Sequence, residues 1–151
     1  MQASITFLPL QKEHLREVME IEKVSFPSPW SVEMFEREIA LMVSHFFVVL
    51  ADSAVIGYGG YWCIHDEAHI VNLAVHPSMR SRQVGRRILD YLIEDMLKYK
   101  VDRILLEVRK SNIAAQGLYT AAGFLRTGSR PRYYGSEDAI LMEKKIETKS
   151  F

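Results

Sequence analysis

A glutamate interrupts one of the most apolar runs of the chain. Glu107 lies in ILLEV, residues 104–108, where β-branched and aliphatic neighbours are typical of a buried strand. A buried ionised carboxylate is costly unless it is paired, so such side chains are rarely fully buried. We therefore expect Glu107 to face an edge or a cleft. A carboxylate in a partly apolar cleft can act as a general base near neutral pH.

Tyr119 could complement this base. It lies in GLYTAAGF, on a helix expected to follow the Glu107 strand, and such crossovers bring the end of the strand near the start of the helix. A tyrosine hydroxyl can return a proton to a leaving group. Two plainer interpretations stay open. Tyr119 could be a core aromatic with its hydroxyl at the surface. Glu107 could form a salt bridge with Arg103 or Arg109, because positions 103, 105, 107 and 109 share one face of the strand.

A basic loop precedes the most regular helical pattern. The segment MRSRQVGRR, residues 79–87, follows a strand expected to end at Val75-His76, and it contains Arg80, Arg82, Arg86 and Arg87. Unpaired N–H groups at a helix start favour an anion, and Gly85 lets a ligand approach the backbone. The loop suits a pyrophosphate, and a solvated charge run is an equally good interpretation. It matches neither a P-loop nor a dinucleotide-binding fingerprint.

Three other patterns carry less weight. DEAH, residues 66–69, matches a helicase signature by letters, but the chain lacks the P-loop that helicases require. The nearby acidic and histidine side chains do not match H-E-x-x-H on a helix, so we expect a polar surface loop and no metal site. Cys63, in YWCI, is expected to be a packed core residue rather than a nucleophile.

The apolar periodicity predicts a single layer of sheet with helices packed on its faces, an α/β (α+β) fold. In the first helix, Leu15, Val18, Met19 and then Glu22 follow helical spacing. Ser31 is expected to cap the second helix, Asp52-Ser53 to form a hairpin turn, and Gly123 to end the last helix. Strands are expected over 4–10, 45–52, 55–64, 68–76, 102–109, 124–134 and 138–146, the last two joined through GSE, and helices over 11–26, 31–43, 78–100 and 112–124.

Length and composition set further limits. The chain has 151 residues, which suits one domain over 1–151, and its 19 basic and 19 acidic side chains give zero formal net charge. A zero net charge argues against direct nucleic-acid binding, where a basic domain is expected. One cysteine excludes an intramolecular disulfide. The sequence shows no signal-peptide pattern and no membrane span, so a cytoplasmic protein is the default expectation.

The ordered motifs resemble the GNAT superfamily of N-acetyltransferases. The resemblance rests on VNLAVHPSMRSRQVGRRILDYLI followed by LLEVRKSNIAAQGLYTAAGF, and it covers nearly the whole chain. FPSPWS, LEVRKSN, LYTAAGF and RPRYYGSEDAILM are similar to the RimI-like branch, bacterial enzymes that acetylate the N-terminal alanine of a small-subunit ribosomal protein. This resemblance implies a GNAT fold with one mixed, mostly antiparallel sheet. It also implies acetyl-CoA as co-substrate, a protein or peptide N-terminus as acceptor, and direct transfer without metal or membrane.

The resemblance also implies roles for individual residues. Glu107 would be the general base and Tyr119 the general acid. The strand segment Leu73, Ala74 and Val75 would offer backbone groups to the pantetheine arm and the thioester carbonyl. The pyrophosphate would be held by Arg80, Ser81, Arg82, Gln83, Val84, Gly85 and Arg86, with Asn112 near the pantetheine. The acceptor groove would be lined by Phe26, Pro27, Tyr133 and Tyr134.

One position departs from the family pattern. The usual loop reads R/Q-x-x-G-x-G/A, and Gln83 stands where the first glycine is expected. If this position needs a positive φ, glutamine strains it, and cofactor affinity would be weaker. Two rival functions are a GNAT enzyme acting on a lysine side chain or a small-molecule amine, and a non-catalytic binding module. Retention of both Glu107 and Tyr119 weighs against the second.

Overall fold

Seven strands form one sheet in the order β1-β2-β3-β4-β5-β7-β6, and all neighbours are antiparallel except β4 and β5. The computed structural model describes residues 4–147, so the expected domain extends a few residues past both ends of this range. The strands are β1 (Ile5–Pro9), β2 (Ser44–Ala51), β3 (Ala54–Ile64), β4 (Glu67–Val75), β5 (Arg103–Arg109), β6 (Leu125–Arg130) and β7 (Ala139–Lys145). The helices are α1 (Leu15–Ser25), α2 (Val32–Ala40), α3 (Val84–Leu97) and α4 (Ile113–Ala121), with single 3-10 turns at Lys12–His14 and Pro77–Met79.

The predicted α/β fold and most local signals are confirmed. Asp52 and Ser53 both have positive φ in the β2–β3 hairpin, as a two-residue hairpin turn of the I′ kind requires. The Ser31 hydroxyl accepts the Met34 N–H at 3.2 Å and caps α2. Gly123 has φ 96° directly after α4, and the Phe124 N–H then reaches the Tyr119 carbonyl at 3.0 Å. These short-range signals therefore determine where the elements end.

Two expected boundaries are wrong. The strand expected over 124–134 ends at Arg130, because Pro131 follows and the chain then turns through positive φ at Arg132 and Gly135. The connection between β6 and β7 is therefore the longer segment 131–138 rather than GSE alone. The third helix begins at Val84 instead of residue 78, which leaves most of the basic segment as a loop before the helix.

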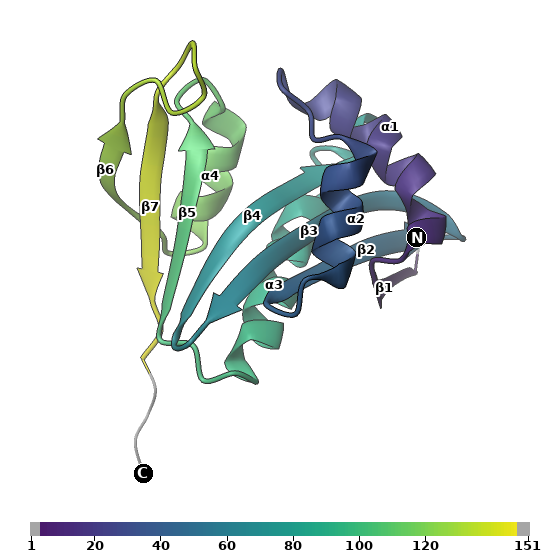
Figure 1. Cartoon of the computed structure of the whole chain (residues 1–151), viewed down its shortest axis with the longest axis horizontal. Coiled ribbons are helices and arrows are strands. Elements are labelled where there is room, and N and C mark those ends of the chain that lie inside the picture. The colour runs from purple at the N-terminus through teal and green to yellow at the C-terminus, as the bar shows by residue number, and fades with distance from the viewer. Residues whose placement is uncertain (1–3, 148–151) are drawn as a thin grey trace.

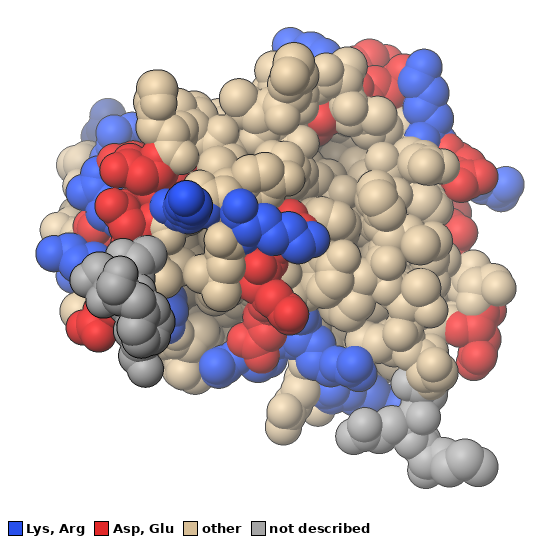
Figure 2. All heavy atoms as spheres, turned by 90° about the horizontal axis from the view of Figure 1, so that it is seen from below, with Lys and Arg blue, Asp and Glu red and all other residues tan. Residues whose placement is uncertain are grey.

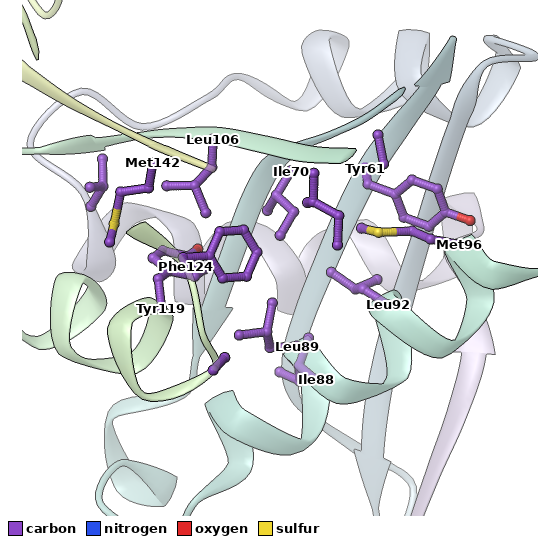
Figure 3. Close-up of a cluster of buried hydrophobic side chains, with 14 of the residues drawn as sticks. Tyr61, Ile70, Ile88, Leu89, Leu92, Met96, Leu106, Tyr119, Phe124 and Met142 are labelled. Carbon is purple, nitrogen blue, oxygen red and sulfur yellow. The ribbon is translucent and has the colours of Figure 1, made fainter. Parts of the chain in front are cut away.

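Helices on opposite faces of the sheet enclose two separate apolar cores (Figure 1). One core joins α1 and α2 to β2 and β3, with Phe35, Val48 and Tyr58 fully buried. The other joins α3 and α4 to the opposite face, and Figure 3 shows its side chains converging between these helices and the strands. The sheet is therefore held rigidly from both sides, which fixes the strands that carry the candidate site.

Helix α3 lies unusually close to β3. A Cβ atom added at Gly59 would come within 2.8 Å of the Ile88 side chain and 3.2 Å of Leu92, and one at Gly57 would come within 2.8 Å of Ile88. Real Cβ atoms do not tolerate such distances, so the glycines are what permits this approach. The basic loop at the start of α3 is thereby placed against the end of β4.

β4 and β5 separate part of the way along their length, as Figure 1 shows. Their parallel pairing runs only from Glu67 and Arg103 to Ile70 and Leu106. Val71 is an extra residue in β4 opposite β3, a β-bulge, and it lies directly after the last paired residue. Beyond this point the facing backbone edges of β4 and β5 have no strand partner, so their N–H and C=O groups are available to a ligand.

Gly59→Ala is expected to lower the free energy of unfolding by about 1–3 kcal/mol, because the new methyl group overpacks the contact with Ile88 and Leu92. Urea denaturation measures the change. Gly117→Ala is the matched control, since nothing lies within 4 Å of the added Cβ and α4 should gain about 0.5–1 kcal/mol. Equal stabilisation by both substitutions would contradict the close approach of α3.

Candidate active site

Two adjoining cavities lie where β4 and β5 separate. The first, which we call the carboxylate cavity, has a volume of about 380 Å³ and is lined by both Glu107 and Tyr119. The second, the loop cavity, has a volume of about 600 Å³ and lies between the end of β4 and the start of α3. Both cavities are lined by Phe26, Leu73, Asn112 and Ala115. The two cavities therefore adjoin at the opening between the strands.

Glu107 projects from β5 into the carboxylate cavity, with its side chain 17% exposed. The alternative that it pairs with Arg103 or Arg109 is not what the structure shows. His69 on β4 contacts the carboxylate through Nε2 and Glu107 Oε2, whereas Arg103 pairs with Glu67 and Arg109 with Glu137. Among the described residues, Oε1 of Glu107 has no hydrogen-bond partner. One oxygen is held in place and the other is available for chemistry.

Tyr119 and Tyr134 border the same cavity as Glu107. Tyr119 is 7% exposed, and burial raises the pKa of its hydroxyl, with a smaller contribution from Tyr134. Burial, Tyr133 and the negative charge of Glu107 raise the pKa of Tyr134 to about 12, against the opposing effect of Arg109. Both phenols are therefore protonated at neutral pH and can serve as hydrogen-bond donors within the cavity.

Arg109 anchors the segment that carries Tyr134. Its guanidinium donates to Glu137 at 3.0 Å and lies 4.3 Å from the centre of the Tyr134 ring, a cation–π contact. Ser111 also donates to Glu137, through its hydroxyl at 2.9 Å and its N–H at 3.1 Å. These bonds lower the pKa of Glu137, with Arg109 as the largest cause. The connection 131–138 is thereby held at the mouth of the carboxylate cavity.

Glu22 lies at the wall of the carboxylate cavity on the α1 side. It is 1% exposed although it occupies a position on the apolar face of an amphipathic helix. Its carboxylate accepts hydrogen bonds from the Tyr58 hydroxyl at 2.6 Å, the Asn72 side chain at 3.0 Å and the Trp30 N–H at 2.9 Å. It thus joins α1 to β3, to the β4 bulge and to the segment that follows α1.

The loop cavity collects most of the residues expected to hold a cofactor. It is lined by Leu73, Ala74, Val75, Arg80, Ser81, Gln83, Val84, Gly85, Arg86 and Asn112. Arg80 is fixed by bonds to the Val75 carbonyl at 3.2 Å and the Ser25 hydroxyl at 3.1 Å. Asn112 caps α4 by accepting the Ala115 N–H at 3.1 Å. Ten of the eleven residues expected to hold a cofactor therefore line this cavity.

These residues fit a pyrophosphate with an extended arm. Gln83 occupies the N-cap position of α3 without a side-chain hydrogen bond, so the first N–H groups of the helix remain available to an anion. An added Cβ at Gly85 would lie 3.6 Å from both Val75 and Leu118, which also line the cavity, so the glycine keeps this space open. The unpaired edge of β4 offers backbone groups to the arm.

Three predicted site residues lie outside the cavity linings. Arg82 borders neither cavity, and neither do Pro27 and Tyr133. Tyr133 is 47% exposed and packs edge-on against Tyr134 at 4.9 Å between ring centres. Phe26 and Tyr134, by contrast, do line the carboxylate cavity as expected. Half of the residues assigned to the acceptor groove therefore line the carboxylate cavity.

Sequence reasoning missed several residues of the site. His69 lies within the strand expected over 68–76, yet its side chain was assigned to a polar surface loop rather than to the site. Glu22 was placed at helical spacing with the apolar residues of the first helix, but no role in the site was assigned to it. No local signal indicated that Asn72 and Trp30 would meet its carboxylate, because three separate elements must come together first.

The surface charge, the candidate metal ligands and the hydropathy of the helices were compared with the expectations from the sequence. On the face shown in Figure 2, acidic and basic side chains lie next to one another, in keeping with zero net charge. Within residues 4–147, no three His, Cys, Asp or Glu side chains gather as metal ligands. No helix in that same range is long and apolar enough to cross a membrane.

Comparisons with known proteins agree with this geometry. The family described as "Acetyltransferase (GNAT) family" matches residues 15–124. The [Ribosomal protein bS18]-alanine N-acetyltransferase of Salmonella typhimurium is 34% identical over 146 residues, which cover 91% of this chain and 95% of that protein. The N-alpha-acetyltransferase RimI of Mycobacterium tuberculosis is 31% identical over 148 residues, covering 93% and 92%. The crystal structure of the ribosomal-protein-S18-alanine N-acetyltransferase from Escherichia coli superposes with a TM-score of 0.88 at 30% identity, covering 97% of both chains.

Gln83→Gly is expected to raise the free energy of unfolding by about 1 kcal/mol, because Gln83 has φ 62° and ψ 17°, a left-handed conformation that penalises a Cβ. Thermal or urea denaturation measures the gain. Gln83→Ala keeps the Cβ and should give no such gain. If alanine stabilised the protein as much as glycine, backbone strain at this position would not be the cause.

Proposed function

Because the chain belongs to the acetyltransferase (GNAT) family and takes its acetyl group from acetyl-CoA, we propose that it acetylates the N-terminal α-amine of a protein. The preferred acceptor is the N-terminal alanine of a ribosomal protein. The observation that carries this proposal is that the two cavities share four lining residues at the opening between β4 and β5. A cofactor in the loop cavity would bring its thioester to the carboxylate cavity, where an amine can meet it.

Glu107 is the proposed general base. A protein α-amine has an unperturbed pKa of roughly 7.7–8.0, so at pH 7 only about a tenth of it is the reactive free amine. The available Oε1 of Glu107 takes a proton from the ammonium, directly or through a water, while His69 holds Oε2. A lysine ε-amine, with an unperturbed pKa of about 10.4, would need considerably more help. The site therefore suits an α-amine better than a lysine side chain.

The opened edge of β4 is proposed to orient the thioester. Leu73 borders both cavities, and Val75 lies further along the same edge in the loop cavity. N–H groups without a strand partner can hold the thioester carbonyl and stabilise the oxyanion that forms when the amine attacks. Fixing the carbonyl beside the amine also supplies proximity and alignment. No covalent enzyme intermediate is needed.

Tyr119 is proposed to assist the departing thiolate. Its hydroxyl is protonated at neutral pH, and it borders the cavity that holds Glu107. A thiol has an unperturbed pKa of about 8.5, which lies below the raised pKa of this tyrosine. Tyr119 therefore stabilises the departing thiolate mainly by donating a hydrogen bond to it. Complete transfer of the proton to the thiolate contributes less. This refines the general-acid role that the resemblance implies.

The aromatic part of the carboxylate cavity suits the end of a peptide chain. Phe26, Trp30 and Tyr134 place aromatic surface around Glu107, and such surfaces bind extended segments together with a few polar groups. Two of the relatives are named as alanine N-acetyltransferases of a ribosomal protein. These names support alanine as the first residue of the acceptor. The proposal also includes acceptor proteins that begin with other residues.

Incubation with acetyl-CoA and a mixed set of peptides tests the proposal. Some peptides begin with a free alanine, and others have a blocked end and an internal lysine. Mass spectrometry locates the added acetyl group. We expect acetylation of the alanine α-amine alone. Acetylation of lysine only, or of a small-molecule amine such as a polyamine and no peptide, would overturn the proposed acceptor while leaving the acetyltransferase family intact.

Glu107→Gln should lower kcat at pH 7 by about 10²–10⁴-fold, the usual contribution of a general base. Raising the pH to 9 should restore part of the loss, because the free amine then no longer needs a base to form. Steady-state rates with an alanine peptide across pH 6.5–9 measure the effect.

Glu67→Gln is the matched control, since Glu67 pairs with Arg103 away from both cavities. It should keep the wild-type pH profile. Full activity of Glu107→Gln at pH 7 would rule out Glu107 as the base.

A further inference from the structure

The buried carboxylate of Glu22 has no role in the mechanism above. All three hydrogen bonds that it receives come from neutral donors, namely the Tyr58 hydroxyl, the Asn72 amide and the Trp30 N–H. A carboxylate can accept all three, because it is an acceptor-only group. Burial and the nearby Glu22 charge raise the pKa of Tyr58, which keeps that hydroxyl a donor.

No positive charge compensates Glu22. Among residues 4–147, no Lys, Arg or His forms an ion pair with it, although a buried charge normally requires one. The Arg109 guanidinium borders the same cavity, but it is bound to Glu137 at 3.0 Å. His69 is similarly committed to Glu107. Among the described residues, Glu22 is therefore the carboxylate in the wall of the carboxylate cavity that has no basic side chain paired with it.

We propose that Glu22 is a specificity-determining residue whose fixed negative charge draws the acceptor into the cavity as an ammonium ion. This inference deepens the proposed function and rests on it. Most of an α-amine arrives protonated at pH 7, and its positive charge balances Glu22 on binding. Glu107 then removes the proton that the amine must lose. One carboxylate recruits the cation and the other converts it to the nucleophile.

The arrangement also explains why Glu22 is buried rather than exposed. Trp30 and Phe26 lie on the segment that follows α1, and both border the cavity. Asn72 lies directly after the β4 bulge that opens the strands. Through its hydrogen bonds, the Glu22 carboxylate is held between the aromatic side chains of the carboxylate cavity and the part of β4 that has separated from β5. A charge away from bulk water is screened less by salt than a surface charge is.

The test compares two peptides that differ only in the amine. One begins with alanine, and in the other a propionyl group replaces that alanine, which removes the amino group and keeps the carbon chain. Dissociation constants are measured at pH 6.5 with CoA present. We expect the wild type to prefer the amine peptide, and Glu22→Gln to reduce that preference by about tenfold, as removal of one nearby charge in a partly buried site predicts.

Two control variants separate charge from packing. Glu17 lies on the same helix outside the cavity and accepts the Val55 N–H at 2.9 Å, so Glu17→Gln removes a carboxylate charge there while its amide oxygen can still accept that bond. Tyr58→Phe removes one bond to Glu22 and keeps the carboxylate. Both should leave the ratio of the two dissociation constants unchanged within about twofold. Both control variants keep the Glu22 carboxylate. Tyr58→Phe therefore remains informative if Glu22→Gln fails to fold.

Two outcomes would overturn the inference. Glu22→Gln could leave the ratio of the two dissociation constants unchanged, for example by weakening both peptides equally, or Tyr58→Phe could abolish the preference for the amine. Acetyl transfer by the wild type is measured in parallel with the alanine peptide. Absence of transfer to any α-amine would refute the proposed function itself, whereas transfer without a change in the ratio would refute only the role of Glu22.

Discussion

The separation of β4 from β5 after Ile70 and Leu106 is the constraint on which the site depends. Paired strands would use their backbone groups on each other, and no cavity could pass between them. The bulge at Val71 follows the last pair directly, and it redirects the strand that we propose holds the thioester. Both cavities, their shared lining residues and the position of Glu107 at the opening follow from this one interruption of the sheet.

An opening of this kind needs rigid support, because unpaired backbone is costly when it is buried. The two apolar cores on opposite faces supply that support, as does the close contact of α3 with the glycines of β3. The cavity walls are then joined by polar contacts between distant elements. Glu22 ties α1 to β3 and β4, and Glu137 ties the β6–β7 connection to Arg109. The sheet therefore stays open without losing its shape.

The parts of the site that sequence reasoning predicted are those with local signals. The run around Glu107, the basic loop before α3 and the Gly123 cap each depend on neighbouring residues, and each lies where it was expected. The role of His69 was missed because its contact with Glu107 joins two strands that are far apart in the sequence. The role of Glu22 was missed because its partners lie on β3, on β4 and in the segment after α1. A buried ionised group becomes intelligible only when the tertiary contacts that satisfy it are known.

Binding of a bisubstrate conjugate tests the central claim, that one path joins the two cavities. The conjugate links the amine of an alanine peptide through an acetyl group to the sulfur of CoA, and isothermal titration compares it with CoA and with the free peptide. If the cavities are continuous, the conjugate should bind about 10²-fold or more tightly than CoA alone, because the second half then binds at a high effective concentration. A conjugate that binds no more tightly than CoA would show that the two cavities are not joined.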